Sequence, residues 1–193
     1  MTTLLLGLIV FLGMHSVSIV APAWRNAMAQ RVGVWTWKGL YSAISLVGFV
    51  LIVQGWTQAR LLPDVLWTPP VWTRHVTMAL MLPVWTLLLA AYLPGRIQST
   101  LKHPMLVATK LWALAHLISH GRTHEVVLFG AFLAWAVADR ISLKRRPPVV
   151  RPQLPGSALN DAIALVGGLA ITGWFVVKGH ALLIGMPLVH AAG

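Results

Sequence analysis

The sequence has no cysteine and very few acidic residues, and both deficits exclude classes of chemistry. Without cysteine there is no disulfide, no cysteine-ligated zinc, no iron–sulfur cluster, no thiolate-bound haem and no thiol nucleophile. Only four carboxylates occur among 193 residues, and each falls at the edge of an apolar run: Asp64, Glu125, Asp139 and Asp161. Catalysis by a pair of carboxylates is therefore not expected.

Charged residues of either sign are also scarce. They make up 10% of the chain, whereas hydrophobic residues make up 58%. A soluble globular domain has about 25% charged and about 45–50% apolar residues, so the composition indicates a membrane protein.

Six apolar stretches are long enough, or nearly so, to cross a bilayer as helices. They cover Thr3–Ala21, Thr36–Trp56, Arg74–Leu93, Pro104–Ser119, Glu125–Ile141 and Ala158–Val177. We therefore expect an all-α polytopic membrane protein, a single transmembrane domain over 1–193 with a bundle of about six helices. Pro83 lies inside the third stretch and should kink that helix.

The basic residues predict the orientation of this bundle. The chain carries 15 Lys and Arg and a net charge of +11, but all of them except Lys110 lie in the gaps between apolar runs or near the ends of those runs, which favours membrane topology over nucleic-acid binding. The gaps after the first, third and fifth stretches hold ten of them: Arg25, Arg31, Lys38, Arg96, Lys102, Arg140, Lys144, Arg145, Arg146 and Arg151. The other side holds Arg60, Arg74, Arg122 and Lys178. The positive-inside rule then places the odd gaps in the cytoplasm and both termini outside.

One segment is predicted to be a linker. Residues 142–157 are basic and rich in proline, most strongly over Lys144–Ser157, so they should form a cytoplasmic connection between the fifth and sixth helices. Such a segment is suited to anionic lipid headgroups, or alternatively to a soluble partner.

Histidine is the unusual residue, with eight in the chain. An ionisable group at membrane depth is costly and is a functional candidate. His15 lies roughly 18 Å from the outer end of the first predicted helix, and His116 lies one to two turns from the outer end of the fourth. Two buried imidazoles on separate helices suit a bis-histidine haem b, and the alternative is that each hydrogen-bonds to a neighbouring helix. His116 and His120 also have the i, i+4 spacing of a zinc pair.

Other polar residues are candidates for contacts to such a cofactor. His75 lies at the outer surface, at a depth close to that of His116, and is the alternative ligand if His15 is too deep. His103 precedes Pro104 and lies about 140° around the helix from His116, so we expect a structural or gating role for it. Arg74, Arg96 and Arg122 are interfacial, suited to haem propionates or to lipid headgroups.

Longer motifs carry a resemblance to a known family. The segment YLPGRIQSTLKHPMLVATKLWALAHLISHG (Tyr92–Gly121), then LFGAFLAWAVADRISLKRR (Leu128–Arg146), closely resembles the NnrU family. FLGMHS around His15, the Arg74–His75 pair and HALLIGMPL from His180 resemble it as well, so the similarity covers nearly the whole chain. The chain departs from the family's usual form after the fourth helix, where LISHG adds His120.

The resemblance implies a location, a cofactor and ligands. NnrU proteins are polytopic proteins of the bacterial inner membrane named from denitrification loci, so both termini would be periplasmic. Their relatives include the 15-cis-zeta-carotene isomerase, a haem b enzyme that flips a carotenoid double bond through redox-dependent ligation. Its ligand positions match His15 and His116, and its additional histidine matches His103.

Three functions are therefore weighed. The first is a haem b redox protein accessory to nitrogen-oxide metabolism, or a redox-gated isomerase acting on a lipophilic polyene. The partners of such a protein would be membrane lipids, the polyene substrate or a redox partner, and no nucleic acid. The second is a non-catalytic scaffold or transporter component with structural histidines. The third is a membrane methyltransferase, because GRIQSTLKHPM loosely resembles an Arg-His-Pro segment of those enzymes, which also need a later acidic pair.

Overall fold

A computed structural model of the chain describes residues 1–62, 64–146 and 155–189. It is helical, which confirms the predicted all-α class; within these ranges the only β pairing is an isolated bridge between Val65 and Arg122. The helices are α1 Thr2–Val20, α2 Pro22–Val32, α3 Val34–Ala59, α4 Thr73–Met81, α5 Val84–Ala90, α6 Arg96–Leu101, α7 Pro104–Ser119, α8 Thr123–Arg145, α9 Ala158–Trp174 and α10 His180–Ile184, with a π-helical turn, η1 Phe175–Gly179, between the last two.

All six predicted stretches are helical. Five segments are long and apolar enough to cross a membrane: Thr2–Val20, Val34–Ala59, Thr73–Ala90, Thr123–Arg145 and Ala158–Ile184. The remaining predicted stretch, the fourth along the chain, forms α7. It is apolar but has only 16 residues, and it is also the shortest of the six predicted stretches. The chain is therefore a multi-pass helical membrane protein.

Proline interrupts the third span where the sequence predicts it. α4 ends at Met81 and α5 begins at Val84, with Pro83 directly before α5. A proline lacks the N–H that continues a helix and its ring clashes with the preceding turn, so the span divides there.

The last span is longer than predicted. The expected end was Val177, but the helical path continues through the π-helical turn to Ile184 and ends at Gly185 in the left-handed conformation (φ 75°). Glycine adopts this conformation without a Cβ clash, which explains why the helix stops there.

Two short helices occupy gaps that the sequence left without structure. α2 begins with Pro22, a residue suited to the first position of a helix, and carries Arg25 and Arg31. α6 begins at Arg96 and is capped from another helix by Asp161. Neither has the hydrophobic periodicity or length that would reveal it in the sequence.

The predicted linker is partly helical. α8 continues to Arg145, so residues 142–145 belong to that helix, and Ser157 caps α9 by accepting a hydrogen bond from the Asn160 amide (3.2 Å). Residues 147–154 lie outside the described residues.

The described helices form two compact units. Unit 1 contains residues 1–70 and 116–149, and unit 2 contains residues 71–115 and 150–193, so α7 belongs to unit 2 up to Ala115 and to unit 1 from His116. The expectation of one transmembrane domain over 1–193 stays a prediction.

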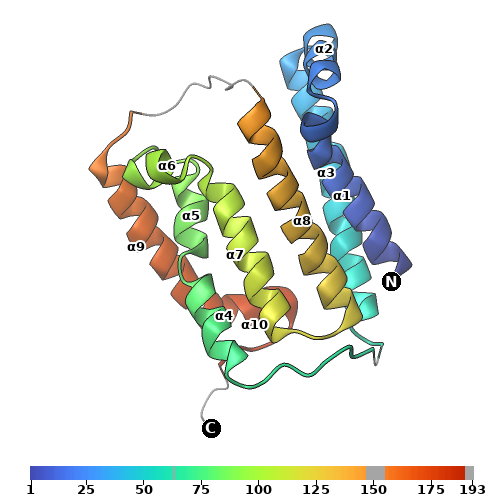
Figure 1. Cartoon of the computed structure of the whole chain (residues 1–193), viewed down its shortest axis with the longest axis vertical. Helices are drawn as coiled ribbons and strands as arrows, with labels where there is room; N and C mark the ends of the chain where they lie inside the picture. Colours follow the sequence, from blue (N-terminus) through green and yellow to red (C-terminus); the bar gives the residue numbers. More distant parts are fainter. Residues whose placement is uncertain (63, 147–154, 190–193) are drawn as a thin grey trace. The chain divides into compact units, whose positions relative to one another are not determined.

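Unit 1 is built on a close pair of helices. α1 and α3 run side by side (Figure 1), and glycines let their backbones approach. A Cβ on Gly48 would lie 2.7 Å from the backbone nitrogen of Phe11, and one on Gly55 would overlap the backbone of Leu4. Small residues at helix crossings are the usual way to gain packing in a membrane, where burial of apolar surface gives no advantage over lipid.

Unit 2 has a similar contact between α5 and α9. A Cβ on Gly168 would overlap Thr86 of α5, and Ala164, one turn earlier, is fully buried. The Gly167–Gly168 pair therefore marks a close contact between the two helices. A core cluster of Val84, Leu87 and Ala108 joins α5 to α7.

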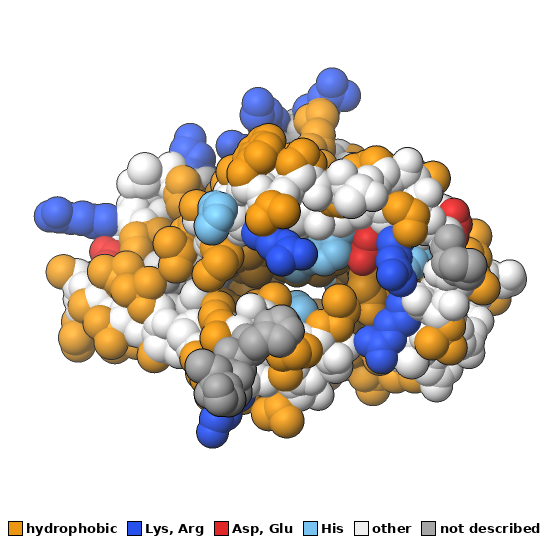
Figure 2. All heavy atoms as spheres, turned by 90° about the horizontal axis from the view of Figure 1, so that it is seen from below, with side chains coloured by type: hydrophobic (Ala, Val, Ile, Leu, Met, Phe, Trp, Pro, Cys, Tyr) orange, Lys and Arg blue, Asp and Glu red, His pale blue; other side chains and the backbone are white. Residues whose placement is uncertain are grey.

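Much of the hydrophobic surface is not covered by protein. Large side chains such as Ile9 (68% exposed), Leu46 (62%) and Val166 (67%) point outward from the long helices. Figure 2 shows hydrophobic side chains over much of the face seen from below, with histidine, basic and acidic side chains among them. Exposed apolar surface on this scale is what lipid tails cover.

Candidate cofactor site

His15 lies among aromatic side chains from three helices of unit 1. Its half-buried ring stacks on Phe11 of α1 at 4.3 Å between centroids. Tyr41 of α3 lies 5.2 Å away and Trp135 of α8 lies 5.8 Å away, the latter edge-on. The histidine therefore lies where α1, α3 and α8 come together, in apolar surroundings.

One nitrogen of His15 is committed to the backbone. Nδ1 lies 2.7 Å from the carbonyl oxygen of Phe11. A carbonyl can only accept, so Nδ1 carries the hydrogen and Nε2 keeps its lone pair. Histidines that bind metals are commonly held in this way, with the second nitrogen fixed by a backbone carbonyl. The arrangement suits Nε2 to an iron atom.

The side chain of Trp135 adds an unsatisfied donor beside His15. Its indole Nε1–H is buried and has no hydrogen-bond partner within the described part of the chain. A buried polar group without a partner is unfavourable by roughly 1–3 kcal/mol. The pattern fits a site in which a bound group supplies the missing acceptor.

His116 lies near the end of α7, against the first half of α8. Its ring stacks on Phe129 at 4.5 Å and on His120 at 5.4 Å, with an interplanar angle of 17° to the latter. His120 Nδ1 donates to the His116 carbonyl and is also 3.0 Å from Ser119 Oγ. No cluster of three or more His, Cys, Asp or Glu is present in the described ranges, so nothing adds a third ligand to the His116/His120 zinc alternative.

The two proposed haem ligands contact α8 at different levels. His15 packs against Trp135 and His116 packs against Phe129. These aromatic residues are six positions apart, or about 9 Å along a helix. His116 is the one nearer to the N-terminal end of α8, which is the direction of the offset that the sequence predicts.

The remaining predicted cofactor residues belong to unit 2. Arg74 and His75 are exposed in the first turn of α4. The carbonyl of His103 accepts from the amides of Leu106 and Val107, so this residue lies directly before α7; its structural or gating role stays a prediction. Arg96 is exposed at the start of α6. The structure groups His15 with His116 in one unit, and places His75, His103, Arg74 and Arg96 in the other.

The N-terminal end of α8 in unit 1 contains a second group of polar residues. His124 is 2% exposed and packs edge-on against Trp56 at 4.8 Å. Glu125 accepts from the Arg122 amide (2.9 Å), which confirms its interpretation as a carboxylate at the start of a helix. The Arg122 guanidinium donates to the Arg60 carbonyl (3.1 Å), a contact within the protein.

Sequence reasoning missed the partners of the histidines. Tyr41, Phe129 and Trp135 lie on other helices than the histidines that they contact. No sequence motif marks them as partners of those histidines. The i−4 spacing of Phe11 and His15 was the one signal present in the sequence, because residues four apart share a helix face.

The fold and the site define the class of protein: a multi-pass helical membrane protein in which an imidazole lies among aromatic side chains from three helices. The family model described as "NnrU protein" matches residues 3–188, and the chain belongs to the NnrU family. No curated protein and no solved structure matches the chain.

Proposed function

We propose that the chain is a haem b-binding redox protein of the bacterial inner membrane, with both termini periplasmic. It would be accessory to nitrogen-oxide metabolism or act as a redox-gated cis–trans isomerase on a lipophilic polyene. The observation that carries the proposal is the hydrogen bond from His15 Nδ1 to the Phe11 carbonyl, which leaves Nε2 available at membrane depth.

The roles of the residues follow from their surroundings. His15 and His116 would hold the haem iron through their ring nitrogens, and His75 is the alternative to His15. Arg74 and Arg96 stay candidates for its carboxylates, and His103 for gating. When bound, the haem would supply one-electron chemistry and a ligation state that responds to reduction.

The protein's own contribution is orientation and exclusion of water. The Phe11 carbonyl keeps the proton on Nδ1 and fixes the rotation of the imidazole. Phe11, Tyr41 and Trp135 surround the ring, so the ligand nitrogen lies in a medium of low polarity. Such surroundings influence the potential of a bound metal.

The experiment is a visible spectrum of the protein purified from cells supplied with haem. A Soret band with the narrow visible bands of a low-spin six-coordinate haem supports the proposal. A colourless, folded protein that still complements its deletion in cells would contradict it.

The alternative, a scaffold or transporter component, is supported by one set of contacts. His120, His124 and His180 each contact a backbone carbonyl or an aromatic ring, as structural histidines do. His180 Nδ1, for example, lies 2.6 Å from the carbonyl oxygen of Met186. The methyltransferase alternative is weakened, because Asp139 pairs with Arg146 and Asp161 caps α6, so both acids it needs are engaged.

A further inference from the structure

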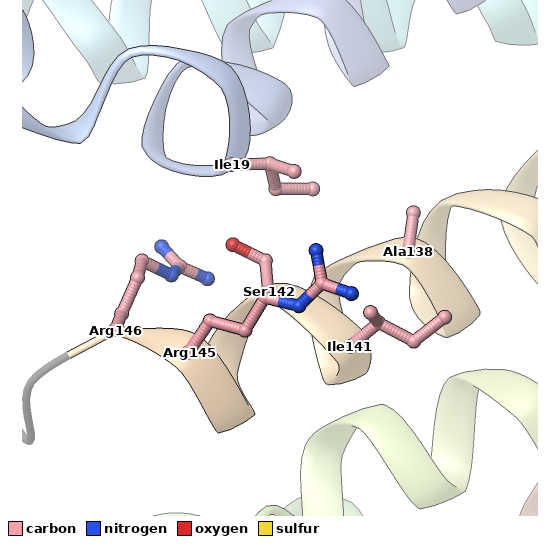
Figure 3. A pocket seen from close by; sticks show the side chains of 6 residues that line it. All are labelled: Ile19, Ala138, Ile141, Ser142, Arg145 and Arg146. Carbon is pink, nitrogen blue, oxygen red and sulfur yellow. The ribbon is translucent and has the colours of Figure 1, made fainter.

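Unit 1 contains a pocket of about 400 Å³ where the C-terminal ends of α1 and α8 meet (Figure 3). Six residues line it: Ile19, Ala138, Ile141, Ser142, Arg145 and Arg146. All but Ile19 come from the last two turns or so of α8 and the residue that follows it.

The lining has two kinds of surface. Ile19, Ala138 and Ile141 are hydrophobic. In Figure 3 the guanidinium groups of Arg145 and Arg146 lie on either side of the Ser142 side chain, beneath Ile19 of α1. An occupant that satisfies both surfaces must therefore be amphiphilic.

Arg146 is held in place but is not fully satisfied. One terminal nitrogen donates to the Ser18 carbonyl of α1 (2.7 Å), and the other pairs with Asp139. Its Nε–H is buried and lacks a hydrogen-bond partner among residues 1–62, 64–146 and 155–189. Burial keeps this donor out of reach of a group in the pocket, so Arg146 contributes positive charge there and not a hydrogen bond from Nε.

Arg145 supplies a second cation. Its side chain is exposed, and no hydrogen bond or ion pair involves it within those same ranges. Among the described residues, Arg146 pairs with Asp139 and Arg145 has no ion pair, so an excess positive charge lies at the pocket. Guanidinium groups match the oxygens of a phosphate in geometry as well as charge.

We propose that this pocket binds the phosphate headgroup of an anionic phospholipid from the surrounding leaflet. The phosphate oxygens accept from Arg145 and from the Ser142 hydroxyl, and Arg146 adds a second positive charge beside them. The glycerol and first acyl carbons lie along Ile19, Ala138 and Ile141. A lipid is favoured over free phosphate because half of the lining residues are apolar and both flanking helices are long enough to span the membrane.

The pocket is distinct from the His15 surroundings. None of its six lining residues is a histidine or an aromatic residue. The lipid site therefore does not depend on haem binding, and the two proposals can fail separately.

The test compares Arg145→Gln with Lys144→Gln in the full-length chain. Lys144 is exposed in the same turn of α8 but does not line the pocket, so its loss removes the same charge from the same end. The protein is stripped of lipid in detergent and titrated with spin-labelled phosphatidylglycerol. We expect Arg145→Gln to weaken binding about fivefold, because one basic residue near an anionic surface contributes about 1 kcal/mol. Lys144→Gln should change it much less. Equal losses in both variants would overturn the pocket assignment.

A second variant fills the pocket without changing its charge. Ile19→Trp should also lower phosphatidylglycerol binding, whereas spin-labelled phosphatidylcholine should bind weakly to every variant. Inorganic phosphate that binds as tightly as phosphatidylglycerol would show a site for free phosphate and overturn the lipid assignment. Loss of haem from Arg145→Gln with unchanged lipid binding would also overturn it, since the arginine would then hold the haem carboxylates.

Discussion

His15 and Phe11 are joined by two independent contacts on one face of α1. The Nδ1 atom of His15 lies 2.7 Å from the Phe11 carbonyl oxygen, and the two rings stack with centroids 4.3 Å apart. The first contact sets which nitrogen carries the proton, and the second limits the rotation of the ring. A change of the Phe11 side chain removes only the second, because the carbonyl belongs to the backbone.

Haem ligation is the first prediction. His15→Ala and His116→Ala should each lose the haem or convert a six-coordinate spectrum to a five-coordinate one, because each would remove one nitrogen ligand. The measurement is the visible spectrum, with haem content from a pyridine haemochrome assay. His120→Ala is the control within unit 1, and His190→Ala, whose position lies outside the described residues, is the second. Two unaltered spectra in the single ligand variants would defeat the assignment. Haem lost from His103→Ala but retained in His116→Ala would contradict the structural role of His103.

The second prediction distinguishes the contribution of the Trp135 ring to stability from that of its indole N–H. Trp135→Phe keeps an aromatic ring beside His15 and deletes a buried donor that has no partner within the described residues, so the free energy of unfolding should change by less than about 1 kcal/mol. Trp135→Ala also removes the ring and should cost about 3–5 kcal/mol. Both are measured by thermal or denaturant unfolding in detergent. An unfolding penalty of Trp135→Phe as large as that of Trp135→Ala would show that the N–H is bonded in the protein.

The third prediction concerns the contact between α1 and α3. Gly55→Leu should destabilise unit 1 by about 3 kcal/mol or more, because a side chain there meets the Leu4 backbone, which cannot move aside without separating the helices. Gly39→Ala is the matched control on α3, since no heavy atom lies within 4 Å of the added Cβ. It should be neutral or slightly stabilising, by up to about 1 kcal/mol. Equal effects of the two changes in an unfolding assay would refute the close packing.

The fourth prediction concerns the carboxylate that caps α6. Asp161 accepts from the amides of Arg96 (2.8 Å) and Ile97 (3.1 Å). Asp161→Ala should cost about 1 kcal/mol and speed amide hydrogen exchange in α6, because two amides at its N-terminus lose their acceptor. Asp161→Asn retains an acceptor oxygen and should restore most of the protection. Exchange measured by mass spectrometry checks both, and protection unchanged in Asp161→Ala would contradict the cap.

The fifth prediction is the topology. A reporter that works only in the cytoplasm should be active when it is fused at residue 150, which lies outside the described residues. A reporter that works only in the periplasm should be active when it is fused at the C-terminus. The expectation rests on the unequal distribution of Lys and Arg between the two sides. The absence of native cysteine allows a check by single-cysteine labelling at Ser157, which should be modified from the cytoplasmic side. An external reporter signal at residue 150 would reverse the assignment.

The long helices could be predicted because each is specified locally. An apolar run of about 20 residues must satisfy its backbone hydrogen bonds internally once in lipid, so it becomes a helix whatever its neighbours do. Pro83 divides its span for an equally local reason, the missing N–H. α6 depends instead on Asp161, which is distant in the sequence, so no local pattern predicts this helix.

The histidines show where local information ends. The sequence by itself determined that His15 and His116 lie within or near membrane spans, because depth follows from distance along a helix. It also placed Phe11 on the face of His15. Only the tertiary structure decided that Tyr41 and Trp135 complete the surroundings of His15, and that Arg145, Arg146 and Ile19 line one pocket. The rotation of one helix about its axis against another depends on side-chain packing, such as that around Gly48 and Gly55, and hydropathy does not encode that rotation.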